Sequence, residues 1–237
     1  MQLFYAPEIT TPEYTLSEEE SKHAIRVLRL TKGDIIHITD GRGSIFSCRI
    51  IDENVKRCRV ETESIQSEYE RMPYSLVMGV APTKSIERFE WFLEKATEVG
   101  ISEIYPLLTT HSERKAIKHE RQQRVITSAC KQSLKAYHPI LHEMTALSEL
   151  VHSDFDGEKL IAHCNEPRSS EGKRLIKDLI KPESNTLVLI GPEGDFSPEE
   201  VDLALCNGFK EISLGTQRLR SETAAVVVAI VASTINQ

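Results

Sequence analysis

Long hydrophobic runs are missing from this sequence of 237 residues. Its longest apolar stretch, residues 224–232, falls well short of the ~18 residues that a membrane-spanning helix needs. Glycine and proline are also scarce, with 11 and 10 residues, which excludes collagen-like and low-complexity chains. With 40% hydrophobic and 27% charged residues, the composition predicts a folded, soluble protein whose length suits one or two domains.

Cysteine spacing typical of a metal site is absent as well. The five cysteines stand at positions 48, 58, 130, 164 and 206 and form no C-x-x-C pair, so we expect no zinc site. The N-terminal residues lack the basic and then apolar pattern of an export signal. An odd number of cysteines without such a signal favours reduced thiols, and we therefore expect a cytoplasmic protein that does not engage a membrane.

An excess of basic residues is missing too, and with it the simplest sign of a nucleic-acid partner. The 29 Lys and Arg are outnumbered by 36 Asp and Glu, which gives a formal net charge of −7. The charges are unevenly placed, however, because residues 111–138 contain seven Lys or Arg and only two acidic residues. This stretch is either a solvated helix face or a surface that contacts RNA phosphates.

The first seventy residues predict a small β-barrel. Ser17 and Glu20 form a capping-box pattern that opens a short helix ending near Leu28. Strand patterns follow over residues 34–39, 44–51 and 56–62, separated by turn-forming residues. We expect residues 1–70 to form a first domain and residues 71–237 a second.

Strand and helix patterns alternate from residue 71 onward. Residues 75–81 form an apolar run typical of a strand buried on both faces, and a predicted helix runs from Ser85 to Gly100. Further strands are predicted at 104–108, 160–163, 187–190 and 211–214, and further helices at 116–137, 170–180, 198–206 and 222–234. This alternation predicts an α/β domain with a mostly parallel sheet.

A glycine-framed turn follows the predicted strand 187–190. It reads Gly191-Pro-Glu-Gly-Asp-Phe-Ser197 and leads into a helix capped by Ser197, at the edge of the sheet where ligands bind. It lacks the spacing and the Lys of common phosphate-binding loops, and the carboxylates of Glu193 and Asp195 would repel a pyrophosphate. The turn is either a plain strand-to-helix connection or the site of a neutral or cationic ligand that carries hydroxyl groups and an adenine edge.

A second turn, Leu214-Gly-Thr-Gln-Arg-Leu-Arg-Ser-Glu-Thr-Ala224, leads into the last predicted helix. That helix is apolar on every side, so we expect it to be buried all round, enclosed by the rest of the chain or by a partner. Arg218, Arg220 and Glu222 lie at its start, where charges are costly unless they are paired or used. The alternatives are a structural ion pair between Arg220 and Glu222 and a functional role for both.

Together the two turns resemble those of the SPOUT methyltransferases, and specifically of the RsmE family of ribosomal RNA small-subunit methyltransferases. Two further stretches support the resemblance, namely His23-Ala-Ile-Arg-Val-Leu-Arg29, and Lys95-Ala-Thr-Glu-Val-Gly100 followed by Ile104-Tyr-Pro106. The resemblance covers nearly the whole chain. It implies methylation of N3 of a uridine in 16S ribosomal RNA, with S-adenosylmethionine as the cofactor.

The resemblance also implies a fold, an assembly and a cofactor site. We expect a C-terminal SPOUT α/β domain with a deep trefoil knot, a small N-terminal PUA-like β-barrel that binds RNA, and a homodimer with the active site at its interface. Backbone groups in glycine-containing turns allow a ligand to approach closely. The cofactor contacts are expected from Leu189, Gly191, Glu193, Gly194, Leu214, Gly215, Leu219, Thr223 and Ala224.

Methylation of uracil at N3 needs removal of the imide proton and stabilisation of the charge that spreads to O2 and O4. We expect Arg220 to stabilise that charge, and Glu222 to act either as the base or as the organiser of the turn. Contacts to ribosomal RNA within the small subunit are expected from His23, Arg26, Arg29, Arg114, Lys115, Arg124, Gln132 and Lys135.

A few positions depart from the family pattern. Asp195 stands where a second Gly is usual, and Ser221 stands where Thr is usual. Lys131 and Lys135 flank Gln132 where Glu and Arg are common. Two other hypotheses stay open, namely methylation of another RNA atom such as a ribose 2′-OH, and an RNA-binding ribosome assembly factor without catalytic activity.

Overall fold

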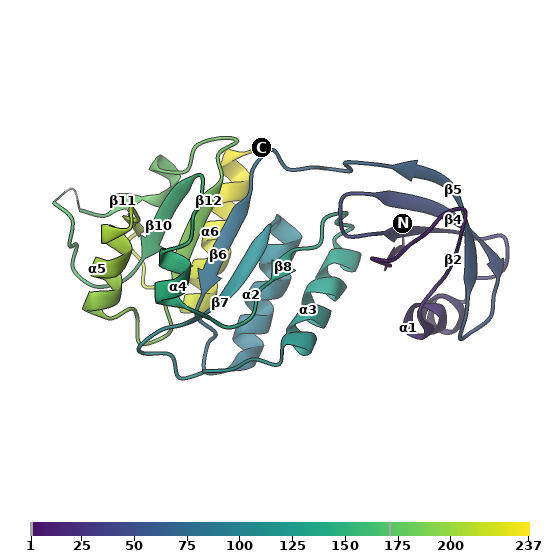
Figure 1. Ribbon diagram of the computed structural model, residues 1–237, viewed down its shortest axis with the longest axis horizontal. Helices are drawn as coiled ribbons and strands as arrows, with labels where there is room; N and C mark the ends of the chain where they lie inside the picture. Colours follow the sequence, from purple (N-terminus) through teal and green to yellow (C-terminus); the bar gives the residue numbers. More distant parts are fainter. Residues whose placement is uncertain (1, 171) are drawn as a thin grey trace. The chain divides into compact units, whose positions relative to one another are not determined.

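The structure, a computed structural model, describes residues 2–170 and 172–237. Contacts between residues divide the chain into two compact units (Figure 1). The N-terminal unit comprises Met1–Arg71 together with Thr127–His138, and the C-terminal unit comprises Met72–Ile126 with Pro139–Gln237. Residues 127–138, which the sequence prediction assigned to the second domain, therefore pack with the first 71 residues.

The N-terminal unit is built on a curled five-stranded sheet in the order β1-β3-β4-β5-β2. Its strands are β1 (Leu3–Tyr5), β2 (Glu13–Thr15), β3 (Ile35–Thr39), β4 (Ile45–Asp52) and β5 (Arg59–Gln66). β1 pairs with β3 in parallel, and the other neighbours are antiparallel. The three strands predicted from periodicity are present with shifted ends, whereas β1 and β2 are too short to produce a recognisable pattern.

The predicted helix after Ser17 is divided into two parts. Helix α1 (Glu18–Lys22) begins where the Ser17 hydroxyl accepts a hydrogen bond from the Glu20 N–H at 3.2 Å. A five-residue π-helix, η1 (His23–Val27), follows, and Arg29 then has a φ of 58°. The positive φ of Arg29 ends the helix. The basic side chains therefore point in directions that differ from those on a continuous α-helix.

Residues 127–138 join the N-terminal unit through hydrogen bonds and one ion pair. The N–H of Gly43 donates to the Ala136 carbonyl at 3.0 Å, and the Thr39 hydroxyl donates to the same oxygen. Lys131 contacts the carboxylate of Glu20 at 2.7 Å. These contacts explain why a segment distant in sequence belongs to this unit.

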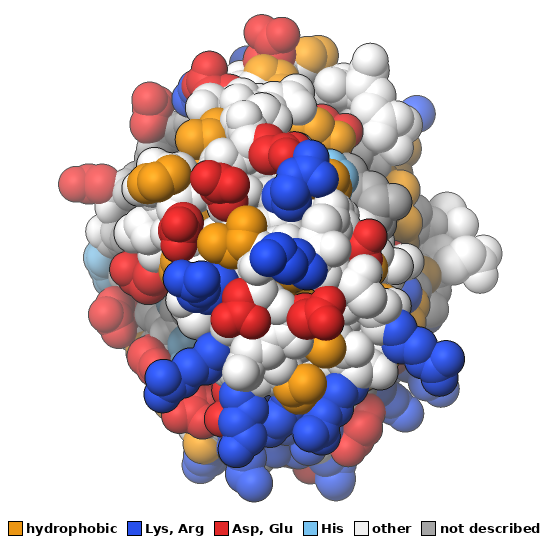
Figure 2. Space-filling view, turned by 90° about the vertical axis from the view of Figure 1, so that its right-hand side faces the viewer, with side chains coloured by type: hydrophobic (Ala, Val, Ile, Leu, Met, Phe, Trp, Pro, Cys, Tyr) orange, Lys and Arg blue, Asp and Glu red, His pale blue; other side chains and the backbone are white. Residues whose placement is uncertain are grey.

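Charges of both signs alternate over the surface of the curled sheet. The guanidinium of Arg49 donates to Glu63 at 2.6 Å, and Arg59 lies 3.5 Å from the Glu13 carboxylate. Figure 2 shows Lys and Arg side chains interspersed with Asp, Glu and apolar side chains over the upper part of the face toward the viewer, and gathered more densely along its lower edge. Paired exposed charges contribute little to stability, but they reduce the net field of the sheet surface.

The C-terminal unit contains a parallel sheet in the order β11-β13-β10-β12-β6-β7-β8, and β9 pairs with β7 (Figure 1). Its strands are β6 (Leu76–Val80), β7 (Glu103–Leu108), β8 (Ile140–Leu141), β9 (Thr145–Ala146), β10 (Glu158–Ala162), β11 (Arg174–Leu175), β12 (Thr186–Ile190) and β13 (Lys210–Ser213). Its helices are α2 (Ile86–Val99), α4 (Leu147–Val151), α5 (Pro198–Cys206) and α6 (Ser221–Ile235), with the 3₁₀-helix η2 (Ile176–Asp178). Helix α3 (His119–Gln132) contributes residues to both units. The prediction of an α/β fold with a parallel sheet is confirmed.

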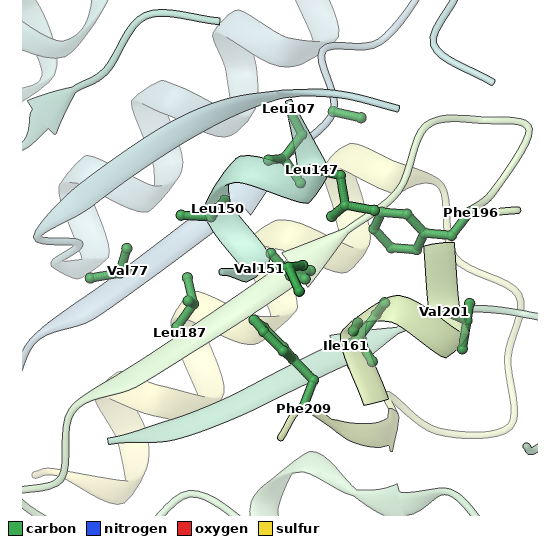
Figure 3. Close-up of a cluster of buried hydrophobic side chains, with 13 residues drawn as sticks. Val77, Leu107, Leu147, Leu150, Val151, Ile161, Leu187, Phe196, Val201 and Phe209 are labelled. Carbon is green, nitrogen blue, oxygen red and sulfur yellow. The ribbon is translucent and has the colours of Figure 1, made fainter. Parts of the chain in front are cut away.

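A hydrophobic cluster fills one face of this sheet (Figure 3). Side chains of the strands, such as Ile161 and Leu187, meet side chains of α4 and α5, such as Leu150 and Val201. Gly79 in β6 leaves room for this packing, because a Cβ there would lie 2.8 Å from Leu150 and Leu189 side-chain carbons. The cluster holds the strands in register and thereby fixes the positions of the turns that follow them.

One prediction about the C-terminal unit is wrong. The helix expected over 170–180, of which residue 171 lies outside the described residues, is instead β11 and η2. β11 pairs in parallel with β13, so pairing with the edge of the sheet outweighs helical propensity there. The last helix, which was expected to be enclosed by the rest of the chain or by a partner, packs on α2, and the chain by itself leaves Ile230 47% exposed.

Candidate functional site

A cavity of about 900 Å³ lies at the carboxyl ends of β10, β12 and β13. The two glycine-containing turns form much of its wall. Of the predicted cofactor residues, Gly191, Glu193, Gly194, Leu214, Gly215, Leu219 and Ala224 line it. Leu189 packs in the hydrophobic cluster, and Thr223 is not on the lining. Most residues predicted for the cofactor are thus brought together in one cavity.

The first turn is closed by Asp195. Its φ of 63° lies in the left-handed region, which Asp tolerates better than most residues and Gly adopts freely. The Asp195 carboxylate accepts hydrogen bonds from the N–H groups of Cys164 at 2.7 Å and Phe196 at 2.8 Å. Gly is usual at this position, and Asp can stand here instead because it tolerates the left-handed conformation.

The second acidic residue of this turn connects it to the loop after β6. The Glu193 carboxylate accepts a hydrogen bond from the Lys84 N–H at 3.0 Å. Arg114 holds the same loop, since its guanidinium donates to the carbonyls of Thr83 at 3.1 Å and Lys84 at 2.6 Å. Arg114, which the sequence suggested for RNA, therefore already serves the wall of the cavity.

The loop after β7 also contacts the first turn. The N–H of Thr110 donates to the Glu200 carboxylate at 2.7 Å, and the ring of His111 lies within hydrogen-bonding distance of the Asp195 carbonyl. A Cβ on Gly194 would approach the Cβ of His111 to 3.0 Å, so glycine allows this loop to lie close. The ends of β6, β7 and β12 are consequently joined by hydrogen bonds rather than free.

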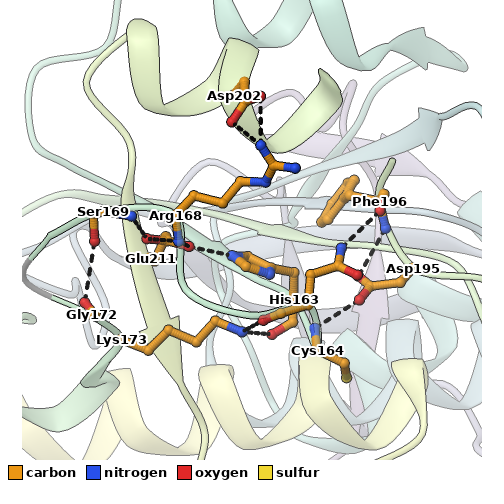
Figure 4. A network of polar contacts seen from close by, with 11 residues as sticks. His163, Cys164, Arg168, Ser169, Gly172, Lys173, Asp195, Phe196, Asp202 and Glu211 are labelled. Atoms are coloured by element: carbon orange, nitrogen blue, oxygen red, sulfur yellow. Dashed lines mark hydrogen bonds and ion pairs between the residues drawn. The ribbon is translucent and has the colours of Figure 1, made fainter. Parts of the chain in front are cut away.

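A buried polar network supports the turn after β10 (Figure 4). The His163 Nε2 and a Glu211 oxygen are 2.8 Å apart, and both side chains are fully buried. Glu211 also accepts hydrogen bonds from the backbone N–H groups of Arg168 and Ser169. Burial alone would raise the pKa of Glu211, but the hydrogen bonds from Ser169, Arg168 and His163 outweigh it and lower the pKa to about 2.

His163 itself is held in its neutral form. Burial, with the charge of Lys173 added, lowers the pKa of the imidazole despite the neighbouring carboxylate. The Lys173 ammonium donates to the carbonyl of His163 at 2.6 Å and to that of Asn165 (Figure 4). A neutral His163 that donates from Nε2 to Glu211 fits these contacts.

The second turn exposes its arginines. Arg218 and Arg220 are exposed and line the cavity, and Gly215 has a φ of 118°. The predicted alternative of an Arg220–Glu222 ion pair is not what the structure shows. The Glu222 carboxylate lies 3.9 Å from Arg88 of α2, and Glu222 is not among the cavity-lining residues.

Arg88, which the sequence motifs did not indicate, lines the cavity from the first turn of α2. A signal was available, because residues that open the helix after a parallel strand lie near the carboxyl end of the sheet, where ligands bind. Arg168, which pairs with Asp202 at 2.7 Å, is not among the cavity-lining residues.

The basic residues predicted for RNA differ in their surroundings. Arg26 and Arg29 are exposed, and His23 packs edge-on against Phe4. Lys115 and Gln132 are exposed, Lys135 is half-buried, and Arg124 lies 3.9 Å from Glu120. In the same stretch, Arg121 pairs with Glu90 at 2.6 Å, which reduces the net charge of this surface.

Metal and membrane features are not found in the part of the chain that the structure describes. Within residues 2–170 and 172–237, no group of three or more His, Cys, Asp or Glu is placed to hold a metal ion. No helix formed by these residues has the length and hydropathy required to cross a bilayer.

Comparison of the sequence with protein families gives two matches. Residues 70–233 match the family described as RNA methyltransferase domain, and residues 16–63 match the RNA methyltransferase PUA domain. The ribosomal RNA small subunit methyltransferase E of Synechocystis is 30% identical over 230 residues, which cover 95% of this chain and 75% of that protein. The protein of the same name from Aquifex aeolicus is 28% identical over the full length of both chains.

Solved structures with the same fold cover the whole chain. A "probable rRNA-methyltransferase" from Porphyromonas gingivalis is 39% identical, with a TM-score of 0.92 over 100% of this chain and 98% of that one. A methyltransferase from Legionella pneumophila, solved in complex with the bound cofactor SAM, is 28% identical with a TM-score of 0.87 and covers 99% and 97% of the two chains. On the combined evidence of its two family matches and its full-length relatives, the chain belongs to the ribosomal RNA small subunit methyltransferase E family.

Proposed function

We propose that the chain methylates N3 of a uridine in the 16S RNA of the small ribosomal subunit and uses S-adenosylmethionine as its cofactor. The observation that carries this proposal is the cavity formed by the two glycine turns at the carboxyl ends of β12 and β13. The type of reaction is inferred from the family, and the cavity is the site at which we place that reaction. The N3 position and the 16S context come from the resemblance of the two turns to the RsmE family.

The residues around the cavity fit S-adenosylmethionine. Gly191 leaves space beside Phe196, since a Cβ there would come within 3.2 Å of the Phe196 ring and N–H. The acidic lining residues Glu193 and Asp195 suit a cationic sulfonium better than a pyrophosphate. When bound, the cofactor supplies an activated methyl group. We propose that the predicted residues on the cavity lining hold it, namely Gly191, Glu193, Gly194, Leu214, Gly215, Leu219 and Ala224, whereas Leu189 and Thr223 lie off the lining.

Arg220 is proposed to stabilise the uracil as its imide proton leaves. It lines the cavity, and no charged partner for it is found among the described residues, so its guanidinium is available to the negative charge on O2 and O4. Glu222 is proposed as either the base or the organiser of the turn. Its position off the cavity lining favours the organising role.

RNA recognition is proposed to involve both units. The exposed Arg26 and Arg29 of the PUA-like unit, together with His23, would contact phosphates. In the other predicted stretch the proposed contacts are Arg114, Lys115, Arg124, Gln132 and Lys135. The hydrogen bonds that Arg114 makes to two carbonyls leave it the least available of these residues.

We further propose that the protein is a homodimer with a trefoil knot in each chain. We place it in the cytoplasm, together with the ribosomal RNA. Ile230 on α6 and Trp91 on α2 are 47% and 42% exposed, and these two helices pack on each other. Exposed large apolar side chains on neighbouring helices are typical of a surface that a second copy covers.

An in vitro methylation assay tests the function directly. The purified chain would be incubated with labelled S-adenosylmethionine and either free 16S RNA or assembled small subunits, and the product nucleoside identified by mass spectrometry. We expect N3-methyluridine. A ribose-methylated product would favour the alternative RNA methyltransferase, and a chain that does not bind the cofactor would favour an assembly factor without catalytic activity.

A further inference from the structure

We propose that Arg88 is a second substrate-contacting arginine of the site and that Glu222 is its positioning residue, an inference that rests on the proposed function. Arg88 lies in the first turn of α2 and lines the same cavity as Arg220. Its side chain is 43% exposed, so part of it is accessible from solvent. The Nε atom of Arg88 lies 3.9 Å from Oε1 of Glu222.

Glu222 is buried away from the cavity, so we expect it to affect the substrate only through another residue. Its side chain is 8% exposed, and it does not line the cavity. Its Oε2 is buried and has no hydrogen-bond partner among the described residues, whereas Arg88 is the described cation within 4.0 Å of its carboxylate. A buried carboxylate is costly to retain. The negative charge of the Glu222 carboxylate is favoured by its place in the first turn of α6 and by the neighbouring guanidinium of Arg88.

The contact with Glu222 leaves the outer, hydrogen-bond-donating edge of the Arg88 guanidinium available to a ligand. The contact with Glu222 is at Nε, and no hydrogen bond of the two terminal guanidinium nitrogens is found among the described residues, so these nitrogens can donate to a ligand in the cavity. Uracil that has lost its imide proton carries negative charge on two oxygens, and Arg88 and Arg220 provide two cations at one cavity. Glu222 does not line the cavity and so is not placed to act as the base, and in this arrangement solvent water takes up the imide proton.

A double-mutant cycle tests the connection between the two residues. Arg88→Met is expected to lower kcat by about 10²-fold, the typical loss for one charge-stabilising donor, with a smaller change in the KM for RNA. Glu222→Gln is expected to lower kcat in the wild-type background but to add nothing to Arg88→Met, since it acts through Arg88. Lys95→Met is the matched control, because Lys95 lies on the same helix, pairs with Glu94 and Glu98, and is not on the cavity lining.

Chemical rescue separates positioning from general structural damage. Added guanidinium ion is expected to restore activity to Arg88→Ala, and to restore much less to the Arg88→Ala, Glu222→Gln double variant, which lacks the carboxylate that orients the ion. Rescue that is equal in both backgrounds contradicts the positioning role. If Arg88→Met does not fold, as judged by circular dichroism, a folded Arg88→Gln variant, which lacks the cation but keeps a polar side chain, contradicts the inference when its kcat is unchanged.

The failure of this inference can be distinguished from that of the proposed function. An active wild-type chain with a fully active Arg88→Met variant overturns only the role of Arg88. Fully additive losses in the double variant overturn the role of Glu222 as a positioning residue. A wild-type chain that binds S-adenosylmethionine but methylates neither free RNA nor small subunits overturns the proposed function and this inference with it.

Discussion

The carboxylate of Asp195 accepts a hydrogen bond from the backbone N–H of Cys164, with 2.7 Å between oxygen and nitrogen. The two residues lie in turns that follow different strands, β12 and β10. One side chain thus connects neighbouring walls of the cavity while its own backbone occupies the left-handed region. A glycine at this position would satisfy the backbone but could not make the connection.

Replacement of Asp195 is therefore expected to affect stability in a graded way. Asp195→Ala should lower the free energy of unfolding by about 1–3 kcal/mol, because it leaves two N–H groups without an acceptor and strains the backbone. Asp195→Asn should cost less, since its amide oxygen still accepts a hydrogen bond. Urea denaturation measures both, and the exposed Asp154→Ala provides the control. Equal stability of the Ala variant and the wild type would show that the connection contributes nothing.

Gly191→Val is expected to weaken S-adenosylmethionine binding by at least about tenfold, because the added atoms occupy space between the turn and Phe196 and displace the cavity wall. Isothermal titration calorimetry measures the affinity, with circular dichroism to confirm folding. Cys206→Ala, an exposed substitution on α5, is the control. Normal affinity in a folded Gly191→Val variant would mean that the cofactor binds elsewhere.

Acid should destabilise the C-terminal unit in two steps, because the pKa values of His163 and Glu211 are both lowered by folding. A lowered pKa means that the unfolded chain takes up the proton first, so stability is lost as the pH falls. The His163 step begins below its ordinary value of 6.5, and the Glu211 step extends from its ordinary value of 4.5 down to about 2. Denaturation midpoints measured between pH 8 and pH 3 report both steps.

Glu211→Gln provides the test of the second step. The variant should be less stable than the wild type at pH 7 by about 1–3 kcal/mol, because the hydrogen bonds from His163, Arg168 and Ser169 lose a charged acceptor. It should also lose the additional pH dependence below pH 4.5 that Glu211 supplies. If the loss of stability below pH 4.5 is the same in this variant as in the wild type, other carboxylates cause that loss.

RNA binding should weaken steeply with salt if Arg26 and Arg29 contact phosphates. Each neutralising substitution, Arg26→Gln or Arg29→Gln, is expected to lower the slope of log affinity against log salt by about one. Fluorescence anisotropy with a labelled RNA at several salt concentrations measures the slope. Lys56→Gln carries the same charge change on a different exposed loop of the unit and should leave the slope unchanged.

Local features of the fold were predictable, because neighbouring residues determine them. Ser197 and Glu200 form the full capping box at the start of α5, and Gly100 ends α2 with a φ of 113°. The apolar runs of β6 and β12 likewise indicate strands buried on both faces. Capping, turn and burial patterns act over a few residues, so they are visible in a single sequence.

Pairings between distant residues were not predictable. Arg88 and Glu222 are separated by most of the C-terminal unit in sequence, and nothing in either local pattern indicates that they meet. The same holds for His163 with Glu211. An ion pair between Arg220 and Glu222 was one of two alternatives suggested by their proximity in sequence, but Arg220 lines the cavity whereas Glu222 lies off the lining, beside Arg88.

The membership of residues 127–138 in the N-terminal unit also constrains how the chain can fold during synthesis. The carbonyl of Ala136 and the ammonium of Lys131 complete contacts with Gly43, Thr39 and Glu20. These partners emerge from the ribosome long after the first 71 residues have been made. The N-terminal unit is therefore expected to stay incompletely packed until a segment beyond β7 is translated, and a fragment that ends at Arg71 would lack part of its own structure.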